Sequence, residues 1–156
     1  MKLNLKRRQS GFTIIEVVIV LAIAATIMVV VFLAVPALQR NSRNNQYRSE
    51  AGQLAAAVAE FTNNNGGTVP ASSPTDNGPT VVGLTKNAKL KTLTIQASDT
   101  KVTVPNPPTT AYYEASSSCG AASADNTYTP GAGSGGVIIF GTENASGIVA
   151  QCIGTQ

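Results

Sequence analysis

Histidine and tryptophan are absent from this chain of 156 residues, and cysteine occurs only twice. Without histidine, the chain cannot build a Ser-His-Asp triad or a Cys-His pair. Two cysteines alone also fall short of the four ligands of a structural zinc site. A Ser-Lys or paired-carboxylate site stays open, although no cluster suggests one. We therefore predict that the chain is not an enzyme, that it has no catalytic or metal-binding residues and that it binds no cofactor.

Charged residues make up only 12% of the chain, and they are unevenly distributed. Four of the 11 basic residues precede Gly11, with no acidic residue among them; they are Lys2, Lys6, Arg7 and Arg8. The remaining chain carries seven basic and eight acidic residues. A second basic group, which lacks interleaved aromatic residues and favours a solvated face, consists of Lys86, Lys89, Lys91 and Lys101. Nucleic acid is therefore not expected as a partner.

The residues from Phe12 to Val35 form one long apolar run whose single charged member is Glu16. A run of this length can cross a bilayer, and a lone segment in hydrocarbon must be a helix because only then are its backbone polar groups paired. A carboxylate inside such a helix costs about 2.5 to 3.5 kcal/mol on insertion scales. Glu16 either reaches to water at the interface or awaits a positively charged partner. The lipid bilayer is thus an expected partner.

The basic residues before this run predict that the amino terminus lies in the cytoplasm. A secretory signal also begins with basic residues, but its apolar core is only about 7 to 15 residues long. Cleavage after Gly11 would instead keep the apolar run on the product and make Phe12 the new terminus. An α-amino group has a reference pKa of about 7.7 to 8.0, so it is mostly protonated at neutral pH. This cut would place a cation close to Glu16.

Three adjoining features resemble the bacterial type IV pilins and their pseudopilin relatives. They are the basic Lys6-Arg7-Arg8, the junction Gly11-Phe12-Thr13-Ile14-Ile15-Glu16 and the uninterrupted apolar helix. The resemblance covers residues 6 to about 61 and extends to the rest only in architecture. It implies that a prepilin peptidase cuts between Gly11 and Phe12 and methylates the new amine of Phe12. It also implies that Glu16, the fifth residue of the mature chain, is the assembly residue.

The resemblance further implies where the protein acts and with what. The chain would wait in the cytoplasmic membrane as a single-pass protein with its amino terminus in the cytoplasm. The pilus assembly machinery would then draw it into an extracellular helical homopolymer that serves adhesion, twitching motility or DNA uptake. Two alternatives stay open: a pseudopilin of a type II secretion or competence system, and a membrane-anchored surface protein that never polymerises.

The helix is expected to continue beyond Pro36, which removes one helical hydrogen bond and commonly kinks the chain. Apolar residues then recur every three or four positions, as on one helical face; they are Tyr47, Ala51, Leu54, Val58 and Phe61. Polar residues, among them Arg43, Asn44 and Glu50, fill much of the remaining surface. We therefore predict four parts: a leader at 1–11, a membrane or filament-core helix at 12–36, an amphipathic helix half at 37–64 and a β-rich head at 65–156.

The head contains short runs that are typical of half-buried strands, at 80–85, 91–97, 101–104, 111–115, 137–141 and 147–153. The last two runs are expected to form a hairpin, and residues 116–136 a long surface loop. We predict an α+β fold in which an antiparallel sheet of about four strands packs on the second half of the helix.

Cys119 and Cys152 both lie on the side of the apolar run that is expected to be exported. In an oxidising compartment such a pair predicts one disulfide, which would stabilise the fold by about 3 to 4 kcal/mol on chain-entropy grounds. Two buried free thiols are the alternative. In pilins the cysteines bracket a variable carboxy-terminal region, and the resemblance gives these two residues a comparable place.

Two pairs of oxygen-bearing residues could bind calcium, as the carboxy-terminal region of major pseudopilins does. They are Asp125-Asn126 and Glu143-Asn144. No Asp-rich loop accompanies them, so turn formation is the favoured interpretation.

Overall fold

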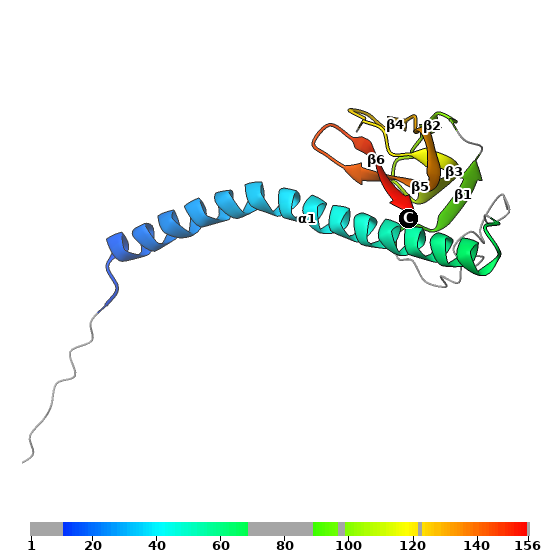
Figure 1. Cartoon of the computed structure of the whole chain (residues 1–156). Helices are drawn as coiled ribbons and strands as arrows, with labels where there is room; N and C mark the ends of the chain where they lie inside the picture. Colours follow the sequence, from blue (N-terminus) through cyan, green and yellow to red (C-terminus); the bar gives the residue numbers. More distant parts are fainter. Residues whose placement is uncertain (1–10, 69–88, 97–98, 122, 156) are drawn as a thin grey trace, which may run out of the picture. The chain divides into compact units, whose positions relative to one another are not determined.

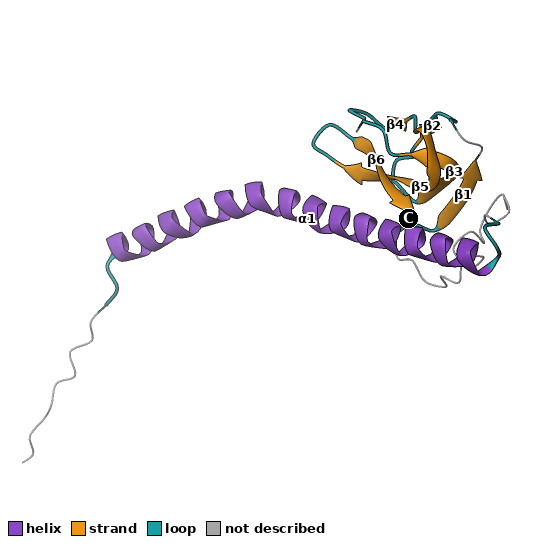
Figure 2. Cartoon of the chain, in the orientation of Figure 1, coloured by secondary structure: helices purple, strands orange, loops and turns teal. Residues whose placement is uncertain are grey.

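The computed structural model describes residues 11–68, 89–96, 99–121 and 123–155. Most of the predicted leader and the strand predicted at 80–85 lie outside these ranges. The described elements, shown in Figures 1 and 2, are α1 (Ile14–Asn64), β1 (Thr92–Gln96), β2 (Val102–Thr103), β3 (Thr110–Ser118), β4 (Thr127–Tyr128), β5 (Gly131–Glu143) and β6 (Ile148–Thr155).

The chain divides into two compact units, one up to Gln39 and one from Arg40, and α1 runs through both. In the first unit the apolar side chains of α1 are exposed; Phe32 and Leu33, for example, are each 77% exposed. By length and composition this helix could cross a membrane. So much contiguous apolar surface is unfavourable in water, so lipid or another protein must cover it.

The second unit contains a four-stranded sheet in the order β1-β3-β5-β6 and a two-stranded sheet of β2 and β4. This arrangement, with the long helix before it, confirms the predicted α+β fold. The predicted antiparallel pairing is correct for β3 with β5 and β5 with β6, but wrong for β1, which runs parallel to β3. The connection from β1 to β3 contains β2 and is long enough for this direction, because a parallel pair needs a connection of about a dozen residues.

The prediction of a loop over residues 116–136 was wrong at both ends. β3 continues to Ser118 and β5 begins at Gly131, and Ser117 and Ser118 pair with Ala132 and Gly131. These strand ends consist of Ser, Gly and Ala, which lack the β-branched and aromatic residues that mark strands in a sequence. Pairing between neighbouring strands therefore decides their conformation.

Apolar clusters cover both faces of the four-stranded sheet. On one face, α1 contributes Leu54 and Val58 and β5 contributes Ile138 and Phe140. On the other face, Val137 and Ile139 of β5 pack with Val102, Val104 and Tyr128. Because β5 is buried on both faces, its apolar residues run without alternation. The predicted stripe on α1 is confirmed, since its members Tyr47, Ala51, Leu54 and Val58 are buried and Phe61 packs beside them. Each fully buried Leu or Val contributes about 1.5 to 3 kcal/mol.

Three polar residues of α1 also face the sheet, although the sequence analysis assigned them to the remaining surface. Arg43 Nε donates a hydrogen bond to Glu143 Oε2 over 2.9 Å. The Asn44 amide donates to the Glu143 carbonyl and accepts from the Glu143 N–H, both over 2.7 Å. The Glu50 carboxylate accepts hydrogen bonds from the N–H groups of Lys89 and Leu90 over 3.0 and 2.7 Å. These residues lie three or four positions from Tyr47 or Leu54, so they share the buried face of the helix.

Candidate processing and assembly site at the start of α1

The first turn of α1 is capped by its own sequence. Thr13 precedes the helix, and its N–H donates to Glu16 Oε2 over 2.9 Å. The Thr13 hydroxyl donates to the same oxygen over 2.6 Å. Thr-x-x-Glu is the spacing of a capping box, in which the glutamate bonds the N–H of the capping residue. A carboxylate in the first turn also interacts favourably with the helix dipole.

This contact changes the interpretation of Glu16. The sequence analysis left two alternatives, a side chain that reaches to water and a side chain that awaits a positively charged partner. The structure adds a contact within the chain, because one carboxylate oxygen pairs with Thr13, while the other oxygen, Oε1, accepts no hydrogen bond from any described residue. The spacing from Thr13 to Glu16 was the signal that sequence reasoning missed.

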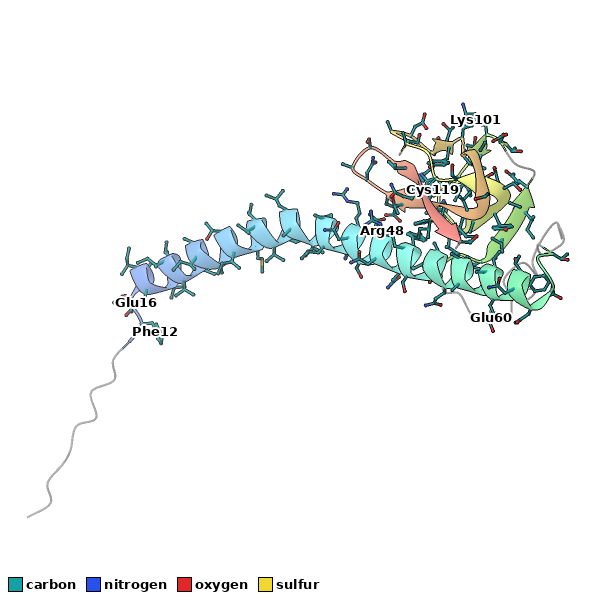
Figure 3. All side chains as sticks on the ribbon, viewed as in Figure 1. Phe12, Glu16, Arg48, Glu60, Lys101 and Cys119 are labelled. Atoms are coloured by element: carbon teal, nitrogen blue, oxygen red, sulfur yellow. A yellow bond between two sulfur atoms is a disulfide. The ribbon has the colours of Figure 1, made fainter. Side chains whose placement is uncertain are left out.

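Gly11 and Phe12 lie just before the helix, and both are exposed. Figure 3 shows Phe12 and Glu16 together at the start of α1. A Cβ atom built on Gly11 would meet no atom within 4 Å, so the backbone there is open. Phe12 and Glu16, together with Val17, Val20 and Leu21, line a shallow hollow of about 210 Å³. The site thus combines an accessible peptide junction, a carboxylate and an apolar surface.

Pro36 lies inside α1, which continues on both sides of it. The predicted continuation of the helix is therefore correct, while a kink at Pro36 stays a prediction.

Cys119, directly after β3, and Cys152, in β6, form a disulfide with their Cα atoms 5.7 Å apart. The structure therefore favours the predicted disulfide over two free thiols. Cys152 packs against the cluster of Val137 and Ile139. The bond ties the segment after β3 to that face of the sheet.

The residues considered for calcium are engaged with other partners. The Glu143 carboxylate is held by Arg43. Hydrogen bonds from the Thr127 hydroxyl, the Thr127 N–H and the Ser123 hydroxyl lower the pKa of Asp125 to about 2. Asn144 Oδ1 accepts from the Ser146 N–H over 2.9 Å, as in an Asx turn. The described residues contain no group of three or more His, Cys, Asp or Glu side chains that could hold a metal ion.

Three glycines, Gly131, Gly133 and Gly136, have the G-x-G-x-x-G spacing of dinucleotide-binding loops. That motif requires a turn from a strand into a helix. Here all three glycines lie inside β5, and no helix follows it in the described part of the chain. A Cβ atom on Gly133 would lie 2.8 Å from the backbone of Ser117, so this glycine permits close strand contact. The spacing therefore indicates no nucleotide site.

Comparison with known proteins identifies the amino-terminal segment. Residues 6–32 match the prokaryotic N-terminal methylation motif, and this match includes Gly11, Phe12, Glu16 and the first part of α1. No curated protein and no solved structure matches the chain. The chain therefore carries the prepilin signal of a type IV pilin-like protein.

Proposed function

We propose that the chain is a structural subunit of a type IV pilus, made as a prepilin and polymerised into an extracellular filament. The observation that carries this proposal is the exposed apolar half of α1, which begins directly after a methylation-motif junction. Lipid would cover this surface before assembly, and the helices of other copies would cover it afterwards. A contact between unlike surfaces that repeats without closing produces a filament.

Processing would occur at the bond between Gly11 and Phe12. Both residues are exposed and precede the first helical residue, Ile14, so the junction lies outside the helix. Glycine has no side chain to obstruct a peptidase at the cleaved bond. The prepilin peptidase would then methylate the amine of Phe12.

Glu16 would act in assembly through its second carboxylate oxygen. Thr13 occupies Oε2, which lowers the cost of holding the carboxylate in a membrane before assembly. Oε1 can accept a hydrogen bond from the terminal amine of Phe12 of a neighbouring copy, while the hydrogen bonds from Thr13 to Oε2 stay in place. A sliding of the helices by one turn would separate the two charges, so this pair would set the axial register of the subunits.

The proposal is tested by shearing filaments from the cell surface and measuring the mass of their subunits. The subunit should begin at Phe12 and carry one added methyl group. An intact leader in the filaments would contradict the processing. A pseudopilin would use the same junction and helix, but its processed form would stay in the membrane. Processed chain found in membranes and never in surface filaments would therefore overturn the assignment to a pilus.

A further inference from the structure

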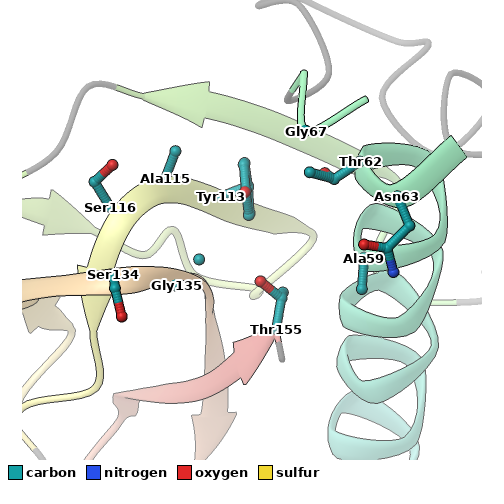
Figure 4. Close-up of a pocket in the computed structure, with 11 residues that line it drawn as sticks. Ala59, Thr62, Asn63, Gly67, Tyr113, Ala115, Ser116, Ser134, Gly135 and Thr155 are labelled. Atoms are coloured by element: carbon teal, nitrogen blue, oxygen red, sulfur yellow. The ribbon is translucent and has the colours of Figure 1, made fainter. Parts of the chain in front are cut away.

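A hollow of about 270 Å³ opens between the last turns of α1 and one end of the sheet, within the second unit (Figure 4). Each of the three elements around the hollow contributes a small residue to its lining: Ala59 on α1, Ala115 on β3 and Gly135 on β5. Folded interiors are normally close-packed, with large residues facing small ones. The hollow is thus a consequence of residue choice on three separate elements.

The backbone beside the hollow departs from regular pairing. Ala115 pairs with Gly136 and Ser117 pairs with Ala132, so Ser134 and Gly135 have no partner on β3. Pairing with β6 begins only at Gly136. Ser116, at the bulge opposite them, has a φ of 55°, a conformation that non-glycine residues adopt at a cost. Ser134 and Gly135 therefore lie outside the regular register that the described residues of β3 and β6 form with β5.

None of the described residues that line the hollow carries a formal charge at neutral pH, and several have polar side chains. Asn63, Ser116 and Ser134 are exposed, and their side chains have no hydrogen-bond partner among the described residues. Hydroxyl and amide groups both donate and accept hydrogen bonds. This described lining offers no cationic side chain for a phosphate or carboxylate, and it combines these polar groups with the apolar surface of Ala59, Tyr113 and Ala115.

We propose that this hollow binds one neutral sugar ring. A sugar presents adjacent hydroxyl groups that both donate and accept, as the side chains of Asn63, Ser116 and Ser134 do. The volume lies just below the range of about 300 to 1,000 Å³ that is usual for ligand pockets, which suits a single ring. The small residues Ala59 and Gly135 let the ring approach the backbone closely. The proposal concerns the unassembled chain and does not rest on polymerisation.

Two glycines provide a matched pair of variants. A Cβ atom on Gly135 would lie 3.6 Å from the Thr155 carbonyl, an ordinary contact, so Gly135→Leu would fill the hollow. A Cβ atom on Gly154 would meet nothing within 4 Å, and Gly154 does not line the hollow. Neither glycine has a positive φ, so both positions accept a side chain. Gly154→Leu is therefore the control for adding a leucine to the sheet.

The experiment uses the full chain, labelled with ¹⁵N in detergent micelles and titrated with glucose, N-acetylglucosamine or inorganic phosphate. At least one sugar should give saturable NMR shifts at the amides of Gly135 and Gly136 and at the Asn63 side chain, with a Kd on the order of 1 mM. Asn63→Ala should weaken this binding several-fold. Gly135→Leu should abolish it, and Gly154→Leu should leave it unchanged.

Three results would overturn the proposal. The first is the absence of saturable shifts with both sugars, and the second is equal sugar binding by Gly135→Leu. The third is a saturable shift of the same amides with phosphate, because the lining would then select charge. If Gly135→Leu fails to fold, Ser134→Ala with Asn63→Ala decides the question, since both side chains are exposed; unchanged sugar affinity in this double variant would overturn the proposal.

Discussion

Glu114 of β3 lies beside Gln96 of β1 in the parallel pair, and each side chain has a buried oxygen without a hydrogen-bond partner. Glu114 is fully buried. Its burial raises the pKa of its carboxyl above the usual value, and hydrogen bonds from the backbone of Thr100 and from the Ser117 hydroxyl act in the opposite direction. A protonated carboxyl has one O–H to donate, which is the group that two neighbouring acceptors lack.

No cationic side chain of the described residues acts on the carboxyl of Glu114 to offset the effect of its burial. The charge of Asp99, which follows β1, raises the pKa of Glu114 further, whereas a hydrogen bond from the Asp99 backbone lowers it. β1 itself carries no ionisable side chain. Lys101 acts on Asp125, whose pKa it lowers. Tyr112 and Tyr128 belong to the cluster of Val137 and Ile139 on one face of the sheet. Burial raises the pKa of both hydroxyl groups, so they are neutral at physiological pH.

We expect the free energy of unfolding to fall as the pH rises through the folded-state pKa of Glu114. Because that pKa lies above the unfolded value of about 4.3, the contribution of Glu114 is fully present only below the unfolded pKa. Glu114→Gln resembles the protonated form and should remove this part of the pH dependence. Thermal unfolding of the unchanged protein and of Glu114→Gln between about pH 4 and pH 8 measures this pH dependence of stability. Parallel pH profiles for the two proteins would contradict the prediction.

Asn44 should contribute measurably to the attachment of the sheet to α1. Its amide makes two hydrogen bonds of 2.7 Å to the backbone of Glu143. Asn44→Ala should lower the free energy of unfolding by about 1 to 3 kcal/mol, because the Glu143 groups lose their partners. Asn45→Ala is the matched control, since Asn45 is exposed on the same helix. Denaturant unfolding of the full chain in micelles compares them, and an equal loss in both variants would refute the role of Asn44.

Capping and assembly by Glu16 can be separated by mutation. Glu16→Gln keeps an oxygen that can accept from Thr13 but removes the charge, so it should insert and be processed normally yet enter filaments poorly. Thr13→Ala removes the hydroxyl bond and keeps the charge, so it should still assemble. Counts of filaments by electron microscopy, with immunoblots for processed chain, measure both effects. Normal filament numbers with Glu16→Gln would show that the charge is not needed for assembly.

Reduction of the disulfide between Cys119 and Cys152 should destabilise the second unit. The loss expected on chain-entropy grounds is about 3 to 4 kcal/mol. The double variant Cys119→Ser with Cys152→Ser should show the same loss without reductant, and reductant should then have no further effect. Thermal unfolding with and without reductant tests this. Alkylation of both cysteines in exported protein that was never reduced would show that the bond does not form.

The sequence by itself determined the features that depend on neighbours along the chain. The apolar run from Phe12 to Val35 is continuous, and the stripe from Tyr47 to Phe61 repeats with the period of a helix. α1 contains the stripe and the run from Ile14 onward. The junction at Gly11 and Phe12 is a local motif, and the methylation-motif match covers it. The hairpin of β5 and β6 joins two β-prone segments that are adjacent in the sequence. Each of these patterns is complete within a few helical turns or strand residues, so no distant contact is needed to recognise it.

Only the tertiary structure decided the features that depend on distant segments. The direction of β1 is set by its pairing with β3, and the strand ends around Ser117 and Ala132 follow from their mutual pairing. Arg43 and Glu50 have hydrogen-bond partners because Glu143 and the backbone of Leu90 lie against the helix. A secondary-structure propensity describes what one residue favours by itself. The conformation of these residues depends instead on distant groups that bury them and form hydrogen bonds with them.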